Sequence, residues 1–109
     1  MTTNDNEFIN IQESTVFQDI VKNMTLGSVM RSWRKCDDLT LQAVAKRLGI
    51  SKQLLGDYER GTKLPSLSKT IEMATVLEAP VELWIRYRIE AELNTLGYEA
   101  QSIEVRKAG

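Results

Sequence analysis

The 109-residue sequence contains no histidine and a single cysteine, Cys36. Without histidine it lacks the commonest general base and the commonest transition-metal ligand, and one cysteine can form neither an intramolecular disulfide nor a metal-binding cluster. No apolar run is long enough for a signal peptide or a membrane span. These absences predict a cytoplasmic protein without a membrane partner, which is not an enzyme and has no metal or other cofactor.

The charges are segregated along the chain, although the formal net charge is only −1. Residues 1–23 hold four acids and one base, residues 24–69 hold nine bases and four acids, and residues 70–109 hold seven acids and four bases. The central block is therefore basic, at +5, and each flank is acidic, at −3. This asymmetry predicts a basic surface that binds nucleic acid and acidic surfaces that contact a partner other than DNA.

Apolar residues recur at helical spacing in six segments, most of which follow a capping residue. A polar arm precedes the first helix, which is predicted over residues 16–24. The other helices are predicted over residues 25–36, 41–48, 51–58, 66–78 and 81–96. In the 66–78 helix, the spacing predicts a buried face made of Leu67, Ile71, Ala74 and Leu77. Near the C-terminus, Ile103 and Val105 alternate with polar residues, which predicts a short strand that needs a pairing partner.

The helix over residues 81–96 has apolar residues on two faces. One stripe is Val81, Ile85, Ile89, Leu93 and Leu96, and the other is Trp84, Tyr87 and Ala91. A terminal surface helix in a monomer needs only one such stripe, so the second predicts a partner, most simply another copy of the chain. Residues assigned to this dimerisation surface are Trp84, Ile85, Tyr87, Ile89 and Leu93. For Trp84 and Tyr87, the sequence leaves two alternatives open, namely a place in the core and a place in the dimerisation surface.

Residues 39–61, LTLQAVAKRLGISKQLLGDYERG, contain two short helical patterns joined at Gly49. The turn between them is too tight for antiparallel helices, so the helices cross steeply and the second projects outward. This is the geometry of a helix-turn-helix that reads a DNA groove.

The segment from Leu26 to Leu83 closely resembles the lambda-repressor-like helix-turn-helix family, the Cro or XRE type. The matching positions need no gaps and are Leu26-Gly27, Arg34, Leu39-Thr40, Val44-Ala45, Leu48-Gly49-Ile50-Ser51, Glu59-Arg60-Gly61, Pro65-Ser66, Leu67, Ala74 and Leu77. The resemblance implies an all-α fold with a five-helix DNA-binding unit. We expect an arm and short helix over residues 1–23, the helix-turn-helix domain over 24–80, and a dimerisation helix and tail over 81–109.

The resemblance assigns base reading to the helix that starts at Ser51, at positions Lys52, Gln53, Leu54 and Asp57. Lysine can donate to guanine, glutamine can pair with adenine, and leucine can touch a thymine methyl. Asp57 could accept from cytosine, but it could equally repel the DNA backbone or pair with Lys52 or Arg60.

Contacts to DNA phosphates are expected from Gln42, Lys46, Arg47, Ser51 and Lys63. The family usually places a glutamine directly after the position of Thr40, where this chain has Leu41. Gln42 follows one residue later and is turned by about 100° on the helix. Either Gln42 contacts the phosphate from this shifted position, or the contact is missing and the affinity for DNA depends on Lys46, Arg47 and Lys63. Asp38 stands where the family often has glycine, so the preceding turn can differ.

The resemblance also implies that Arg34 and Glu59 meet as a largely buried ion pair. Such a pair would tie the first helix of the unit to the end of the recognition helix.

These features together predict a sequence-specific, DNA-binding transcriptional regulator, with repression favoured. It would bind double-stranded DNA at a palindromic operator as a homodimer. An alternative is an antitoxin that autoregulates its operon and binds a toxin protein through its acidic flanks. A third interpretation is a protein-interaction adaptor that has lost DNA binding.

Overall fold

The computed structural model describes residues 24–100 and 103–109. The predicted arm and the helix before Met24 therefore lie outside the described residues. The described part is all-α, as predicted, and contains five helices. They are α3 (Leu26–Cys36), α4 (Leu41–Leu48), α5 (Lys52–Arg60), α6 (Leu67–Val76) and α7 (Val81–Thr95).

Four of the five helices begin at a serine or threonine whose side chain caps the first turn. The hydroxyl oxygens of Thr25, Thr40, Ser51 and Ser66 each accept a hydrogen bond from the amide three residues later, at 3.0 to 3.2 Å. Such caps satisfy amides that have no partner inside the helix. Because capping is a local property, these helix starts agree with the sequence prediction. Helix α7 instead follows Pro80, which fixes its entry.

The ends of the helices use left-handed backbone conformations. Gly49 and Gly61 end α4 and α5 with φ values of 70° and 80°. Asp38, after α3, and Glu78, after α6, adopt φ values of 55° and 56° without being glycine. The turn at Asp38 thus keeps the left-handed conformation that a glycine would adopt more easily.

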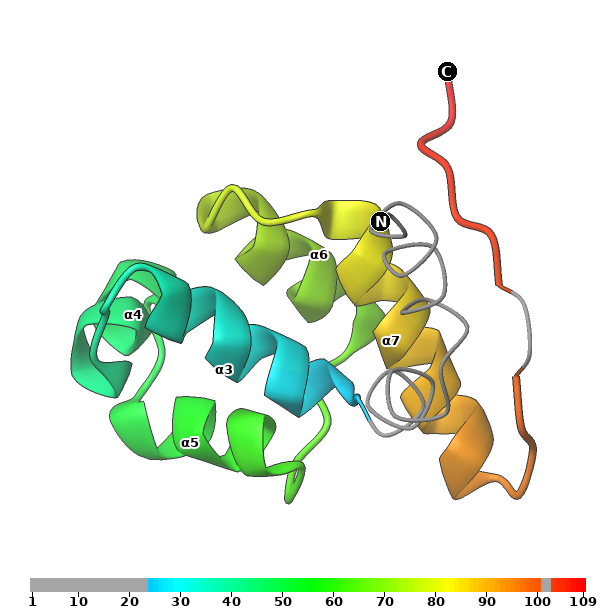
Figure 1. Ribbon diagram of the computed structural model, residues 1–109, viewed down its shortest axis with the longest axis horizontal. Coiled ribbons are helices and arrows are strands. Elements are labelled where there is room, and N and C mark those ends of the chain that lie inside the picture. Colours follow the sequence, from blue (N-terminus) through cyan, green and yellow to red (C-terminus); the bar gives the residue numbers. More distant parts are fainter. Residues whose placement is uncertain (1–23, 101–102) are drawn as a thin grey trace, which may run out of the picture.

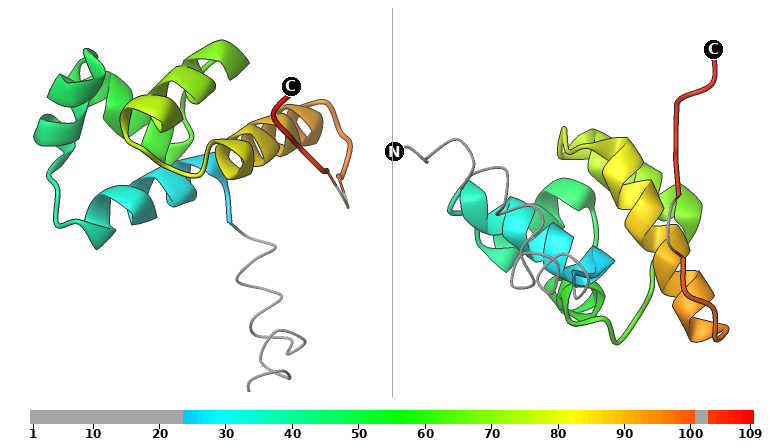
Figure 2. Two further views of the ribbon diagram at one scale, coloured as in Figure 1. Left: turned by 90° about the horizontal axis from the view of Figure 1, so that it is seen from above. Right: turned by 45° about the vertical axis from the view of Figure 1, so that its right-hand side comes forward.

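Helix α3 lies at the centre of the arrangement, with α4 and α5 toward one end and α7 toward the other (Figures 1 and 2). It contacts α5 on one side and α7 on the other, while α6 contacts α4 and α7. The helix-turn-helix is thereby held away from α7, and its outer side is left to solvent.

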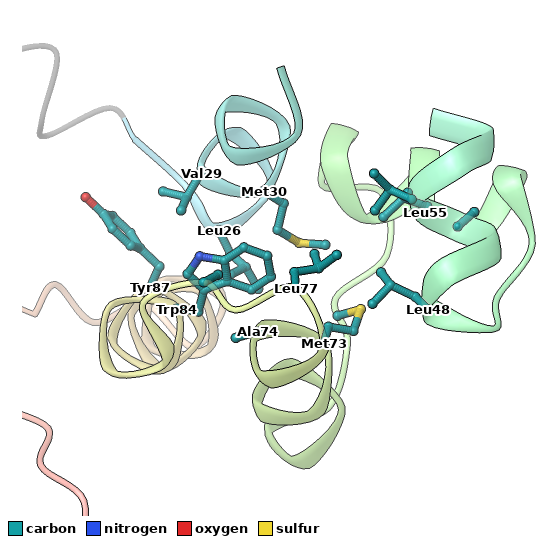
Figure 3. Close-up of a cluster of buried hydrophobic side chains, with 13 residues drawn as sticks. Leu26, Val29, Met30, Leu48, Leu55, Met73, Ala74, Leu77, Trp84 and Tyr87 are labelled. Carbon is teal, nitrogen blue, oxygen red and sulfur yellow. The ribbon is translucent and has the colours of Figure 1, made fainter. Parts of the chain in front are cut away.

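The core contains side chains from all five helices. Its buried apolar members are Leu26, Val29, Met30, Val44, Ala45, Leu48, Leu55, Met73, Ala74, Leu77, Ala79, Trp84 and Tyr87. Figure 3 shows the indole of Trp84 between residues of α3 and α6. Trp84 is 0% exposed and Tyr87 is 6% exposed. Their assignment to the dimerisation surface was therefore wrong, because the chain covers both side chains itself.

The buried face of α6 differs from the predicted one. Leu67 and Ile71 are 41% and 38% exposed, whereas Thr70 and Met73 are fully buried beside Ala74. Thr70 can be buried because its hydroxyl donates to the Ser66 carbonyl at 2.8 Å. The periodicity predicted that Thr70 faces solvent, but its hydroxyl group forms its hydrogen bond with the carbonyl of the residue that caps the same helix.

The predicted C-terminal strand is absent from the described residues 98–100 and 103–109. A strand needs a second strand to satisfy its backbone, and the single chain supplies none there. The described residues of this segment follow α7 as an extended trace without helix or strand (Figure 1).

Candidate nucleic-acid interface

The turn between α4 and α5 fixes the orientation of the second helix. The amide of Ile50 donates to the Ala45 carbonyl at 3.0 Å, which closes the turn behind Gly49. Leu55, on the inner side of α5, is only 1% exposed. Lys52 and Gln53, on the outer side, are exposed. Helix α5 therefore presents its polar side to solvent while its apolar side is anchored, and Leu54 is half-buried at the edge.

Several residues that were expected to contact phosphate surround this exposed side. Gln42, Lys46 and Ser51 are exposed, and the side chain of Lys63 is 64% exposed. Leu41 is half-buried and packs against the core, so it cannot replace the family's usual glutamine. Gln42 lies beside it in the first turn of α4 and is the only side chain of the two that faces solvent.

Arg47 contacts the protein in a way that the sequence did not predict. Its guanidinium donates to the Val76 carbonyl at 2.9 Å and lies 3.8 Å from the Glu78 carboxylate. A cation at the end of a helix is favourable, because the free carbonyls carry partial negative charge. Arg47 therefore holds the C-terminal end of α6, and we do not include it among the proposed phosphate contacts.

Asp57 is also occupied within the chain. Its carboxylate Oδ1 accepts from Arg60 Nη2 at 2.7 Å and from the Thr62 hydroxyl at 3.1 Å. Its Oδ2 lies 3.9 Å from Lys63 Nζ, and its side chain is 16% exposed. The carboxylate thus organises the end of α5 and the loop after it. The alternative that Asp57 pairs with Arg60 is therefore confirmed, and because both oxygens face cations of the chain, we do not include Asp57 among the proposed base contacts.

Arg60 was not among the predicted site residues. Its side chain is 61% exposed and lies on the same side of α5 as Lys52. Two signals in the sequence could have indicated it, namely an acidic residue at i−3, Asp57, and a glycine at i−4, Gly56.

The Arg34–Glu59 ion pair was predicted and is present. Arg34 Nε and Nη2 donate to the two carboxylate oxygens of Glu59 at 2.9 and 3.0 Å, and Nη1 donates to the Leu39 carbonyl at 2.8 Å. The hydrogen bonds with Glu59 raise the pKa of Arg34 above its ordinary value, against the opposing effect of burial. Because this pKa is raised, the contribution of the Arg34 charge is fully present below the ordinary arginine pKa and is lost as the pH rises through the raised value.

Gly27 explains how α3 can approach the end of α5. A Cβ at this position would lie 2.4 Å from the Glu59 carbonyl oxygen and 2.6 Å from that of Tyr58. Only glycine lets the two backbones come so close. The same close approach brings Arg34 within reach of Glu59, so α5 is fixed to the core at its C-terminal end.

The described residues contain no group of three or more histidine, cysteine, aspartate or glutamate side chains that could hold a metal ion. Within residues 24–100 and 103–109, no helix is long and apolar enough to cross a membrane.

The sequence of this chain is similar to those of known proteins. A family model described as a helix-turn-helix domain matches residues 25–84. The HTH-type transcriptional regulator YazB of Bacillus subtilis is 43% identical over 51 residues, which are 47% of this chain and 74% of YazB. YobD, a regulator of the same type from that organism, is 34% identical over 53 residues, 49% of this chain and 47% of YobD.

A solved structure is similar as well. The crystal structure of an HTH_3 family transcriptional regulator from Vibrio cholerae superposes with a TM-score of 0.52 at 28% identity. The match covers 69% of this chain and 41% of that protein, so this chain spans less than half the length of that regulator and of YobD. Because the family model covers more than half of the chain, the protein belongs to the XRE-like helix-turn-helix family, whose relatives are named transcriptional regulators.

Proposed function

We propose that the protein is a sequence-specific regulator that binds double-stranded DNA by inserting α5 into the major groove. The observation that carries this proposal is the division of α5 into an anchored apolar side and an exposed polar side with Lys52 and Gln53. A helix that reads DNA needs both, since base contacts require a fixed orientation.

The side chains of α5 have distinct proposed roles. Gln53 reads an adenine through two hydrogen bonds, Lys52 donates to a guanine, and Leu54 touches a thymine methyl. Lys46, Gln42, Ser51 and Lys63 bind phosphates, which position α5 without reading sequence.

We further propose that two copies bind one palindromic operator. Two recognition helices related by a two-fold axis enter successive major grooves about 34 Å apart. The dimer seam lies along α7, where Ile85, Ile89 and Leu93 are half-buried and Leu96 is 64% exposed. This seam continues past the end of the helix to Tyr98, which is 68% exposed. Bound at a promoter, such a dimer represses transcription by occlusion.

Selection of bound sequences from random DNA duplexes tests the proposal. We expect the purified protein to enrich a palindrome. Gln53→Ala should lose the preference at one position in each half-site and weaken binding there by about 1 to 3 kcal/mol. The matched control is Lys63→Ala, which should weaken binding to all sequences and flatten the salt dependence by about one phosphate.

Each outcome separates the candidate functions. Enrichment of no sequence would favour the adaptor and remove the DNA-binding proposal. An equal loss of selectivity in both variants would show that the two side chains have been given the wrong roles. An antitoxin would enrich a palindrome in the same way, and it differs by forming a complex of fixed stoichiometry with a toxin encoded in its own operon.

A further inference from the structure

The exposed side of α5 contains an arginine that lies flat along the helix. Residues 52, 56 and 60 follow one another at i, i+4 spacing and therefore share one face. At the middle position, Gly56 has no side chain, and the guanidinium of Arg60 occupies the space. A Cβ on Gly56 would lie 2.9 Å from Arg60 Nη1 and 3.6 Å from Cζ and Nη2. The side chain of Arg60 thus turns back toward the start of α5.

Asp57 holds this guanidinium in place. Its Oδ1 accepts from Arg60 Nη2 at 2.7 Å, and the hydroxyl of Thr62 donates to the same oxygen at 3.1 Å. The Asp57 side chain is mostly buried, at 16% exposure, while that of Arg60 is 61% exposed. The acid is therefore fixed by the protein, and the arginine that it orients faces solvent. Among the described residues, Arg60 uses one N–H of Nη2 for its hydrogen bond, which leaves the second N–H of Nη2, together with Nη1 or Nε, for a bidentate ligand.

Asp57 organises the loop after α5, but the combination of Gly56 with an ion pair to an exposed arginine does little for the stability of the helix itself. Glycine is unfavourable inside a helix, and exposed ion pairs contribute little. A carboxylate on a DNA-facing surface would also repel phosphates unless it served another purpose. Orienting a guanidinium is such a purpose, because a pre-oriented arginine loses less freedom when it forms two parallel hydrogen bonds with a base.

We propose that Arg60 is a specificity-determining residue that reads a guanine in the major groove through O6 and N7. Asp57 is its positioning residue, and Gly56 leaves the space through which its side chain reaches the middle of α5. This inference rests on the proposed function, since it requires that α5 enters the groove. It replaces Asp57 as a base contact with the arginine that Asp57 holds.

Selection of bound duplexes with wild-type protein, Arg60→Ala and Arg60→Lys tests the inference. We expect the wild-type operator to contain a guanine whose preference disappears in Arg60→Ala, while the other positions keep theirs. The affinity of Arg60→Ala for that operator should be about 5- to 150-fold lower than that of the wild type. When this guanine is replaced in the operator, the variant and the wild-type protein should bind it equally. Arg60→Lys keeps the charge but loses the planar fork, so it should also lose most of the preference.

Gly56→Ala provides an independent variant, because the added methyl must displace Arg60, to which the three nearest heavy atoms all belong. We expect it to weaken the same guanine preference in the wild-type background and to have no further effect in Arg60→Ala. Unfolding midpoints measured in parallel confirm that the variants are folded.

Three results would overturn the inference. A uniform loss of affinity in Arg60→Ala, with a salt slope reduced by about one and full recovery in Arg60→Lys, would make Arg60 a phosphate ligand. An unchanged wild-type palindrome in Arg60→Ala would remove Arg60 from the interface while leaving the proposed function intact. Failure of the wild-type protein to enrich any sequence would remove both.

Discussion

At the residue scale, the contact between Arg34 and Glu59 is the clearest case in which geometry decides an energetic question. Two hydrogen bonds join the guanidinium to both carboxylate oxygens, and the side chains are 11% and 6% exposed. Burial makes the pair costly to form, so its net contribution is small, but removing one partner strands a charge. The pair therefore specifies where α3 meets α5 more than it adds to stability.

We predict that Arg34→Met or Glu59→Gln lowers the free energy of unfolding by about 3 to 5 kcal/mol. The double variant Arg34→Met/Glu59→Gln should lose much less than the two single variants together, because no charge is left buried. Urea unfolding of all four proteins at one pH gives the coupling energy. Additive losses would show that the two side chains act independently.

Two non-glycine residues adopt left-handed backbone conformations, and replacing them with glycine is predicted to increase the stability of the protein. Asp38 and Glu78 have φ values of 55° and 56°. Replacing Glu78 with glycine removes the steric cost of this conformation and should raise the free energy of unfolding by about 1 kcal/mol. Asp38→Gly should gain about 0.5 kcal/mol, because aspartate tolerates the conformation better.

The control for these variants is Glu72→Gly, at an exposed position inside α6. It should lose about 1 kcal/mol, because glycine is unfavourable in a helix interior. Thermal unfolding of the three variants checks the signs of these changes. A lower stability of Glu78→Gly would mean that the ion pair of Glu78 with Arg47, at 3.8 Å, contributes more than the backbone conformation costs.

At the scale of elements, the sequence predicted what local chemistry controls. The starts of α3, α4, α5 and α6 could be predicted because each depends on a hydroxyl and an amide three residues apart. The buried face of α6 could not, since burial of Thr70 in place of Leu67 depends on how the whole helix docks. The contact between Arg47 and the Val76 carbonyl could not be predicted for a similar reason, because spacing leaves the side-chain conformation open. The pairing of Asp57 with Arg60, in contrast, was one of the alternatives that the sequence offered.

Glycines at two helix positions provide a matched pair of variants. A Cβ on Gly27 would lie closest to backbone atoms of α5, whereas a Cβ on Gly56 would lie closest to the flexible end of Arg60. We therefore predict that Gly27→Ala is destabilising by about 1 to 3 kcal/mol, because α3 must move away from α5. Gly56→Ala should be neutral or stabilising by up to about 1 kcal/mol, from its better helix propensity.

Urea unfolding distinguishes these two effects. Since both substitutions add the same methyl group to a helix, a difference in sign can come only from their surroundings. Equal effects would show that α3 and α5 can separate without cost, and the close approach at Gly27 would then not be needed to hold the recognition helix.

At the scale of the whole molecule, the charge distribution agrees with the positions of the helices. The basic block of residues 24–69 contains α3, α4 and α5, and the acidic block that begins at residue 70 contains most of α6 and all of α7. DNA binding at one end and self-association at the other would keep phosphates away from the acidic surface. The sequence predicted this division, because net charge by segment survives folding even where individual contacts do not.

The exposed apolar side chains identify two surfaces on which a second copy could pack. Leu96 and Tyr98 lie at the end of α7, whereas Leu64, Leu67 and Ile71 lie on and before α6. We predict that Leu96→Glu gives a folded monomer, because it places a charge in the proposed α7 seam. Leu67→Glu, the matched control on the other surface, should remain a dimer.

Sedimentation velocity over a concentration series measures both variants. Binding to a full palindrome should weaken strongly in Leu96→Glu, while binding to an isolated half-site should match the wild type, because the monomer keeps α5 but loses the second contact. If Leu67→Glu became the monomer instead, the two-fold axis would pass beside α6. The loop after α5 would then lie near the centre of the operator, and the spacing between half-sites would be correspondingly short.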